Sequence, residues 1–177
     1  EDPIMLKAYQ NGADIHAFTA SQIFDVPLEE VTDAQRRSGK VVNFGVIYGM
    51  GSTRLASTLD ITQTEAKSYI DNYFERYAGI AAYFDKLVEE AENTSMVHTM
   101  FGRRRLIPDI HAKGGRRAFA ERVAQNTPIQ GTAADIIKMA MLTIQHDIET
   151  YHLPMRMLLQ VHDELVFEVA PDFVEDA

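Results

Sequence analysis

The chain has 177 residues, of which 46% are hydrophobic and 24% charged, as in a soluble globular protein with one domain or two small lobes. It has no cysteine, which excludes disulfides and thiolate metal sites, and no apolar run approaches the roughly 20 residues that cross a bilayer. The net charge of -9 argues against a phosphate-rich partner, but basic residues gather in two clusters, 36–40 and 103–122, which suit an anion.

Helices dominate the first part of the chain. Apolar residues at helical spacing predict a helix over residues 16–24, whereas residues 1–13 show no clear core pattern. Thr32 or Asp33 can cap the next helix, which covers residues 34–48 and ends at two glycines.

Two more helices and a hairpin follow. Thr62 and Glu65 have the spacing of a capping box and begin the first helix, and the second covers residues 79–93. The β-prone runs 97–100 and 105–107 predict a short hairpin around a Phe-Gly turn.

The last third of the chain predicts a long helix and a second hairpin. The helix covers residues 116–151, and Pro128 inside it predicts a break or kink near residues 126–127. The apolar runs 155–161 and 165–169 predict two strands with acidic residues at the turn. The fold class is therefore α+β, predominantly helical, with an antiparallel β-hairpin.

The helix over residues 34–48 carries the first candidate site. Arg36, Lys40, Phe44 and Tyr48 are four apart, so at about 100° per residue they lie along one face. Arg36 to Phe44 covers ~12 Å of helix axis, which suits a triphosphate held by two cations, with a sugar and base against an aromatic ring. The alternative is an amphipathic helix whose aromatic residues belong to the core and whose basic residues are solvated.

A second candidate site lies at the turn of the last hairpin. Asp163 and Glu164 are adjacent there and follow His162. Carboxylates on a tight hairpin are hard oxygen ligands that suit Mg²⁺. The alternatives are a solvated acidic turn or a metal-dependent phosphohydrolase, although no histidine-rich ligand set accompanies this one.

A third candidate site lies on the long helix. Arg122, Asn126 and Gln130 are four apart and would project from one side. Long polar side chains in such a row can donate to sugar oxygens and minor-groove acceptors, whose pattern varies little with sequence. The alternative is a polar solvent face beside a small-residue packing patch at residues 131–134.

Together and in this order, the motifs resemble those of family A DNA polymerases. Residues 36–49 resemble motif B, the nucleotide-binding helix of the fingers, and residues 160–165 resemble motif C, the palm hairpin with catalytic carboxylates. Residues 14–16 and 127–135 resemble further segments of the family, so the resemblance extends over essentially the whole chain.

The resemblance implies a division of the chain and a role for each motif. Residues 14–113 would form the helical fingers, residues 1–13 a remainder of the palm, and residues 114–177 a partial palm with the catalytic hairpin. The nucleotide-binding residues would be His16, Arg36, Lys40, Phe44 and Tyr48. The residues that contact primer–template DNA would be Arg116, Arg117, Arg122, Asn126, Gln130 and His162. The metal-binding and catalytic residues would be Asp163 and Glu164, with Lys40 as the acid that protonates departing pyrophosphate.

The implied activity is template-directed transfer of a nucleotide from a dNTP to a primer 3′-hydroxyl with two Mg²⁺ ions. In this family a phenyl ring at the place of Phe44 disfavours dideoxynucleotides and a phenol accepts them. The complete enzyme is expected to be a monomer without membrane contact. It would be cytoplasmic and associated with the nucleoid in a bacterium, with an organelle as the alternative location.

The family's motif A, a strand similar to Asp-Tyr-Ser-Gln-Ile-Glu that supplies a second metal-binding aspartate, is absent from the sequence. The chain is therefore expected to be a fragment that is inactive by itself. The main alternative is a non-catalytic module, derived from a polymerase, that grips duplex DNA. Such a module would keep the row that begins at Arg122 but has no use for Lys40 or Asp163.

Overall fold

The computed structural model describes residues 2–175, so residue 1 and residues 176–177, at the ends of the two expected palm segments, lie outside the described residues. The helices are α1 Pro3–Gln10, α2 Ile15–Phe24, α3 Asp33–Ile47, α4 Ser52–Leu59, α5 Gln63–Arg76, α6 Ala78–Thr94 and α7 Gly115–Thr150. The strands are β1 Met96–His98, β2 Arg104–Leu106, β3 Met155–Val161 and β4 Glu164–Val169, and short 3-10 turns cover Leu28–Glu30 and Pro108–His111. The predicted α+β class, mostly helical, is confirmed.

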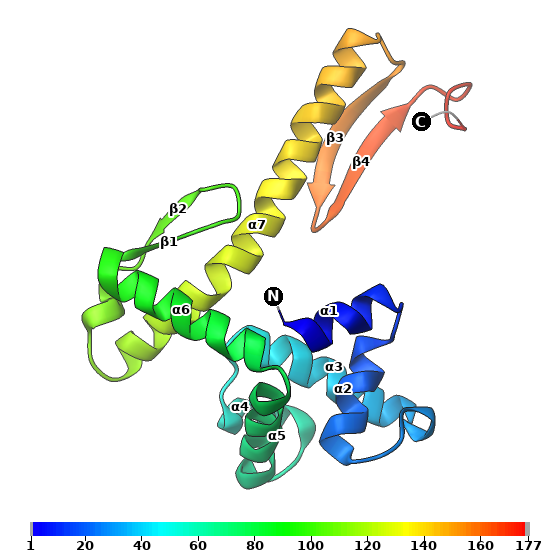
Figure 1. Ribbon diagram of the computed structural model, residues 1–177. Coiled ribbons are helices and arrows are strands. Elements are labelled where there is room, and N and C mark those ends of the chain that lie inside the picture. Colours follow the sequence, from blue (N-terminus) through cyan, green and yellow to red (C-terminus); the bar gives the residue numbers. More distant parts are fainter. Residues whose placement is uncertain (1, 176–177) are drawn as a thin grey trace.

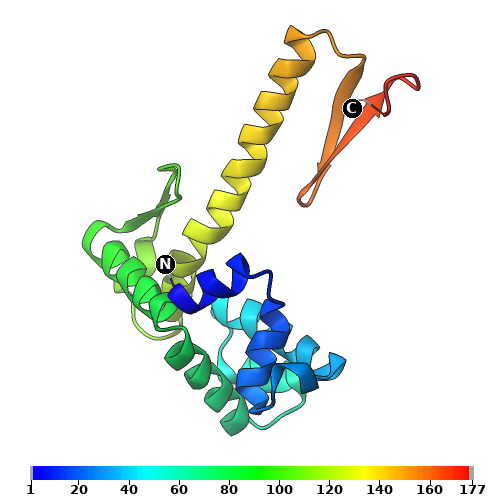
Figure 2. The same cartoon turned by 45° about the vertical axis from the view of Figure 1, so that its right-hand side comes forward.

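Helices α1 to α5 pack into one lobe, and α6 leads from it to the hairpin β1–β2 (Figure 1). Helix α7 then extends away from the lobe and carries the hairpin β3–β4 at its far end, as Figure 2 also shows. The core of the lobe is built around Val42, Leu55, Tyr73 and Tyr77, which are almost fully buried. A second, smaller core joins the end of α6 to the start of α7.

Capping residues explain where several helices begin. The Thr62 hydroxyl accepts from the backbone N–H of Glu65 at 3.2 Å, and the Glu65 carboxylate accepts from the backbone N–H of Thr62 at 2.8 Å. The predicted capping box is therefore confirmed, and Thr32 forms a second one with Gln35 at the start of α3.

Two helices are missing from the predicted elements. In α1, Asp2 accepts from the backbone N–H groups of Ile4 and Met5, and Pro3 occupies the first helical position, which is a recognised start signal. In α4, Leu55 and Ala56 are buried in the lobe core. Both helices have eight residues, too few for helical spacing to stand out, and packing against the lobe supplies their stability.

The expected break at Pro128 does not occur, because α7 runs without interruption over 36 residues, or ~54 Å. Pro128 removes only the one backbone donor that would pair with the carbonyl of Ala124, and in the preceding position the Thr127 hydroxyl adds a hydrogen bond to the carbonyl of Val123 at 2.6 Å. The long flanks on both sides keep the helix continuous. Within residues 2–175, no helix is long and apolar enough to cross a membrane.

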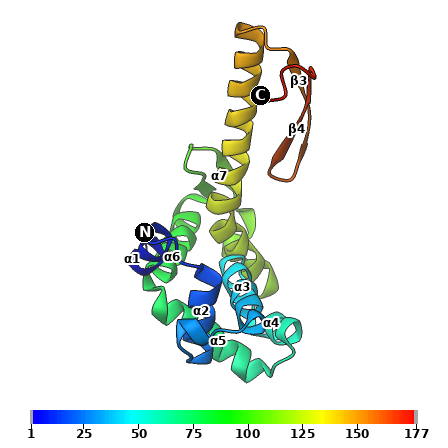
Figure 3. The ribbon, with the colours of Figure 1, turned by 90° about the vertical axis from the view of Figure 1, so that its right-hand side faces the viewer.

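The hairpin β3–β4 folds back along α7, so its turn faces the helical lobe (Figure 3). Its base lies against the last turns of α7, where Ile148, Leu153, Met155 and Phe167 line a shared hollow. The turn is shorter than predicted, because Glu164 already pairs with Val161 as the first residue of β4.

The hairpin β1–β2 docks on α7 by polar contacts. The Thr99 hydroxyl and the Arg103 guanidinium donate to the buried carboxylate of Asp135 at 2.7 and 2.5 Å. A Cβ on Gly131 would lie 2.7 Å from Thr99, so the glycine permits the close approach. Of the small-residue patch expected at residues 131–134, Gly131 and Thr132 pack against this hairpin, whereas Ala133 and Ala134 are exposed.

Candidate functional site

The face of α3 that bears Phe44 and Tyr48 is open to solvent. Phe44 exposes 45% of its surface and Tyr48 42%, and their rings stack with centroids 6.3 Å apart and planes 16° apart. The Nζ atom of Lys40 lies 6.0 Å from the centroid of the Phe44 ring. The helix buries its other side through Val42 and Val46. The alternative in which these aromatic residues belong to the core is therefore wrong.

Helix α2 packs against the buried side of α3 closely enough to bring His16 to the edge of this open face. A Cβ on Gly39 would lie 2.3 Å from the carbonyl oxygen of His16 and 3.0 Å from the backbone nitrogen of Ala20, so only glycine allows the crossing. The His16 and Phe44 rings are consequently 5.5 Å apart, centroid to centroid. Residues 28 positions apart in the chain thus share one surface.

Asp14 joins the start of α2 to Arg36. Its carboxylate caps α2 by accepting from the backbone N–H groups of His16 and Ala17, both at 3.0 Å. It also accepts from Nε of Arg36 at 2.5 Å. The hydrogen bond from Ala17 and the one from Arg36 lower the pKa of Asp14. Asp14 therefore stays charged and holds Arg36 beside His16.

The pKa of the His16 imidazole is lowered. Burial is the main cause, Asp14 opposes it, and the positive charges of Arg36 and Lys40 lower the pKa further. An imidazole ordinarily has a pKa near 6.5, so His16 is mostly neutral at physiological pH.

A cleft of about 670 Å³ lies beside this face, between α3, α4 and α7. Its lining includes Lys40, Phe44, Tyr48, Arg54 and Arg122. Arg54 is a cation that the motifs do not predict, because it lies in the unpredicted helix α4. In the sequence, the one feature that could indicate a role for Arg54 is its position shortly after the glycines that end α3.

The row on α7 meets the end of α3. A Cβ on Gly49 would lie 2.6 Å from Cγ of Arg122, and the Asn126 amide donates to the carbonyl of Tyr48 at 3.2 Å. Within residues 2–175, the Asn126 Oδ1 atom is buried without a partner. Gln130 lies one turn further along and is exposed. Arg122 and Asn126 thus border the aromatic face, and Gln130 continues the row.

The two other predicted DNA-binding arginines differ in their surroundings. Arg117 donates to Glu121 at 2.8 Å, to the carbonyl of Ile110 at 3.1 Å and to Glu92. The contact with Glu92 ties α7 to α6, and the hydrogen bonds to Glu92 and then Glu121 raise the pKa of the Arg117 guanidinium. Arg116 is mostly exposed, with Asp109 at 3.9 Å. Arg116 is therefore open to a phosphate, whereas Arg117 already has acidic partners.

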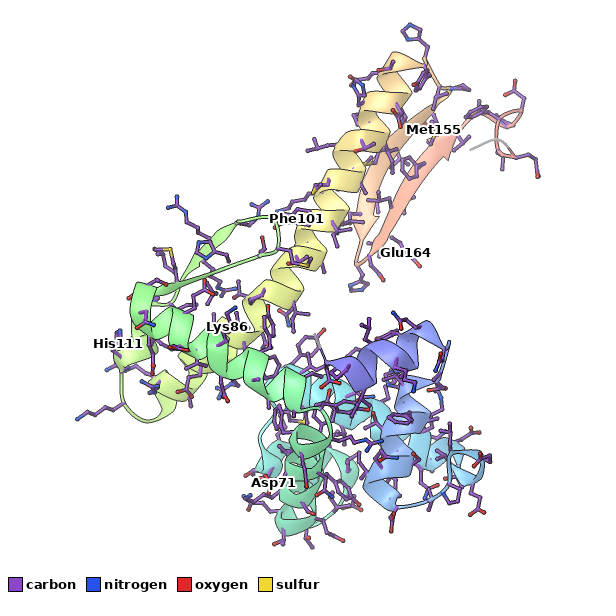
Figure 4. All side chains as sticks on the ribbon, viewed as in Figure 1. Asp71, Lys86, Phe101, His111, Met155 and Glu164 are labelled. Atoms are coloured by element: carbon purple, nitrogen blue, oxygen red, sulfur yellow. The ribbon has the colours of Figure 1, made fainter. Side chains whose placement is uncertain are left out.

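The turn of the β3–β4 hairpin presents His162, Asp163 and Glu164 to solvent. His162 adopts the left-handed conformation, and the Gln160 amide donates to its carbonyl at 2.7 Å, which braces the turn. Figure 4 shows Glu164 at the end of the hairpin that faces the helical lobe, far from Met155. Two adjacent exposed carboxylates fit a Mg²⁺ ion that keeps several waters. No group of three metal-ligating side chains occurs within the part of the chain that the structure describes.

Comparisons with known proteins agree along the whole chain. The sequence model of DNA polymerase family A matches residues 1–177. DNA polymerase I of Pseudomonas aeruginosa is 47% identical over 176 residues, which are 99% of this chain and 19% of that protein. DNA polymerase I of Geobacillus stearothermophilus is 46% identical over 176 residues, or 99% of this chain and 20% of that protein. The chain spans about a fifth of the length of these curated relatives.

One solved structure is similar over almost the full length. It is the POL domain of Pol1 from M. smegmatis in a complex with DNA primer-template and dNTP. The TM-score is 0.89 and the sequence identity 41%, over 99% of this chain and 31% of that one.

Proposed function

The chain belongs to DNA polymerase family A, and on this premise we propose that it is the fingers and part of the palm of a longer DNA-directed DNA polymerase. The longer enzyme transfers a nucleotide from a dNTP to a primer 3′-hydroxyl under the direction of a template. The observation that carries the proposal is the open face of α3, where two cations are followed by two stacked, exposed aromatic rings. The solved relative, a complex with DNA primer-template and dNTP, supports it.

The incoming nucleotide lies along α3. Arg36 and Lys40 bind the triphosphate as charge-assisted donors, and His16 adds a neutral donor. Phe44 packs on the sugar and base, and Tyr48 lies near the templating base, where an aromatic ring accepts any of the four bases. Arg36 exchanges Asp14 for the triphosphate as the nucleotide enters.

The primer–template duplex lies along α7 and the hairpin turn. Arg122, Asn126 and Gln130 form the row that grips sugars and minor-groove acceptors near the primer end. Arg116 and Arg117 contact the DNA backbone. Arg116 does so with its exposed guanidinium, whereas Arg117 does so while it stays hydrogen-bonded to its acidic partners. His162 approaches the duplex from the turn.

Asp163 and Glu164 hold Mg²⁺ in this account, with Asp163 as the main ligand. Two Mg²⁺ ions, once bound, supply the positive charge that favours attack of the primer 3′-hydroxyl and departure of pyrophosphate. Lys40 donates a proton to the departing pyrophosphate. A non-catalytic DNA-binding module is a weaker candidate, because it has no use for exposed carboxylates at the turn or for Lys40 beside the aromatic face.

The 177-residue chain alone is expected to show no template-dependent primer extension. Asp163 and Glu164 give at most a few of the roughly six oxygen ligands of Mg²⁺, so they hold the ion weakly. The test incubates the purified chain, with its helix content checked by circular dichroism, with primer–template, dNTPs and Mg²⁺. Measurable extension that depends on the template would contradict the expectation.

Phe44→Tyr in the full polymerase is expected to increase the use of dideoxynucleotides at least about tenfold relative to dNTPs. A dideoxynucleotide lacks the 3′-hydroxyl, and the tyrosine hydroxyl against the sugar supplies a hydrogen-bonding group in its place. One such hydrogen bond corresponds to about a tenfold change. The measurement is the ratio of kcat/KM for the two substrates. Phe101→Tyr is the matched control, because Phe101 is also exposed but lies in the turn of the hairpin β1–β2. Equal ratios in the wild type and Phe44→Tyr would overturn the placement of Phe44 on the sugar.

A further inference from the structure

A buried series of hydrogen-bonded side chains lies directly behind the nucleotide-binding face of α3. Asn43 precedes Phe44 in the sequence but points to the interior, where only 4% of it is exposed. Its Oδ1 accepts from the Thr19 hydroxyl at 2.9 Å, and the Thr19 oxygen lies 3.3 Å from the hydroxyl of Tyr77. Its Nδ2 lies 3.1 Å from Nδ1 of His16. These contacts thus lead from Tyr77, at the junction of α5 and α6, through Thr19 of α2 and Asn43 of α3 to His16.

The surroundings fix which way the Asn43 amide faces. Its nitrogen also lies 3.4 Å from the carbonyl oxygen of Ile15, which can only accept a hydrogen bond. The amide nitrogen must therefore face Ile15 and His16, and the amide oxygen must face Thr19. An amide N–H that points at Nδ1 of His16 requires a lone pair on that ring nitrogen, so the hydrogen of the neutral imidazole lies on Nε2.

We propose that Asn43 is a positioning residue that holds His16 in the neutral tautomer with its hydrogen on Nε2, ready to donate to the triphosphate. The inference rests on the proposed function, in which His16 contacts the nucleotide. The other tautomer would present a lone pair to a phosphate oxygen and repel it. Arg36 and Lys40 supply the positive charge, so His16 serves as a directed, uncharged donor.

The lowered pKa of His16 agrees with this arrangement. Burial is its first cause, and Arg36 and Lys40 add to the effect against Asp14. A protonated imidazole would carry a hydrogen on Nδ1 that faces the Asn43 amide hydrogens, so the same contact disfavours the cation. The groups around the ring and the amide behind it therefore favour one protonation state.

The first test reads the tautomer directly. The full polymerase, labelled with ¹⁵N only in histidine, is studied by NMR near pH 7.5, and His16→Gln identifies the His16 signals. We expect Nδ1 to resonate as an unprotonated ring nitrogen and Nε2 as a protonated one. A proton on Nδ1, in either the other tautomer or the cation, would overturn the proposal.

The second test is a double-mutant cycle on primer extension. Asn43→Ala is expected to raise the KM for dNTP roughly five- to tenfold and to leave kcat within about twofold, because a ground-state donor is lost. In a His16→Ala background, Asn43→Ala should add less than about twofold, since Asn43 acts through His16. Thr19→Val keeps Asn43 but removes the hydroxyl that orients its amide, so it should give a smaller increase in KM than Asn43→Ala. It replaces Asn43→Ala as the test if that variant does not fold.

The outcomes separate the two proposals. If His16→Ala leaves the KM for dNTP unchanged, the assignment of His16 to the nucleotide fails. If His16→Ala raises the KM and the Asn43→Ala effect is fully additive to it, the nucleotide assignment stands and the positioning role of Asn43 is overturned.

Discussion

Asp163→Asn in the full polymerase is expected to reduce the rate of nucleotide incorporation by about 10³-fold, the scale on which a preorganised charge-stabilising group acts. Asparagine keeps the size of the side chain but removes the charge that binds Mg²⁺. The turn stays in place, because Val161 still pairs with Glu164 and Gln160 still braces His162. The measurement is single-turnover primer extension at saturating dNTP over a series of Mg²⁺ concentrations.

The same hairpin offers a matched control. Glu168 is an exposed carboxylate on β4 that pairs with Arg156 at 2.6 Å, away from the turn. Glu168→Gln should leave the rate within about twofold, since exposed ion pairs contribute little to stability. Glu164→Gln should fall between the two variants. If Asp163→Asn kept more than a tenth of the wild-type rate, the role of this turn in metal binding would be wrong.

Lys40→Ala is expected to slow incorporation by about 10²- to 10³-fold at saturating dNTP, within the range of a general acid. The Nζ atom of Lys40 lies 6.0 Å from the centroid of the Phe44 ring, a position from which it would reach a triphosphate that extends along α3. The measurement is rapid-quench primer extension. Lys67→Ala is the control, because Lys67 is an exposed lysine of the same lobe that pairs with Asp71 on α5, the aspartate labelled in Figure 4.

Lys40→Arg separates the charge of Lys40 from its proton. Arginine keeps a positive charge but releases a proton far less readily, since the pKa of a guanidinium lies far above that of an ammonium group. If Lys40 is the acid, Lys40→Arg should remain at least about tenfold slower than the wild type. A full recovery of the rate would assign Lys40 to electrostatic binding alone.

The sequence predicted the long elements well, for physical reasons. Helix α5 has a side-chain capping box that can be identified by spacing alone, and the strands of β3–β4 are apolar runs on either side of a polar turn. Helices α1 and α4 lack a comparable signal because they are short and depend on the lobe that they pack against. Pro128 destabilises the helix only locally, and the long helical turns on either side of it keep α7 continuous.

The site was predictable where it lies on one helix and not where it joins several. The face from Arg36 to Tyr48 follows from a spacing of four residues. The contact of Asp14 with Arg36, the link from Asn43 to His16 and the approach of Arg54 to the cleft join different helices. No periodicity within one helix reports such contacts, because they depend on how the helices pack together, as where Gly39 lets α2 approach α3.

The central claim is that one face of α3 binds the triphosphate of the incoming nucleotide. Arg36 and Arg37 are adjacent and both exposed, but they lie about 100° apart around the helix, and only Arg36 belongs to that face. The direct measurement is the Kd for dNTP of the polymerase bound to a primer–template with a dideoxy-terminated primer. Arg36→Ala should weaken binding at least about tenfold and Arg37→Ala less than about twofold. Equal effects of the two substitutions, or no effect of Arg36→Ala, would contradict the account.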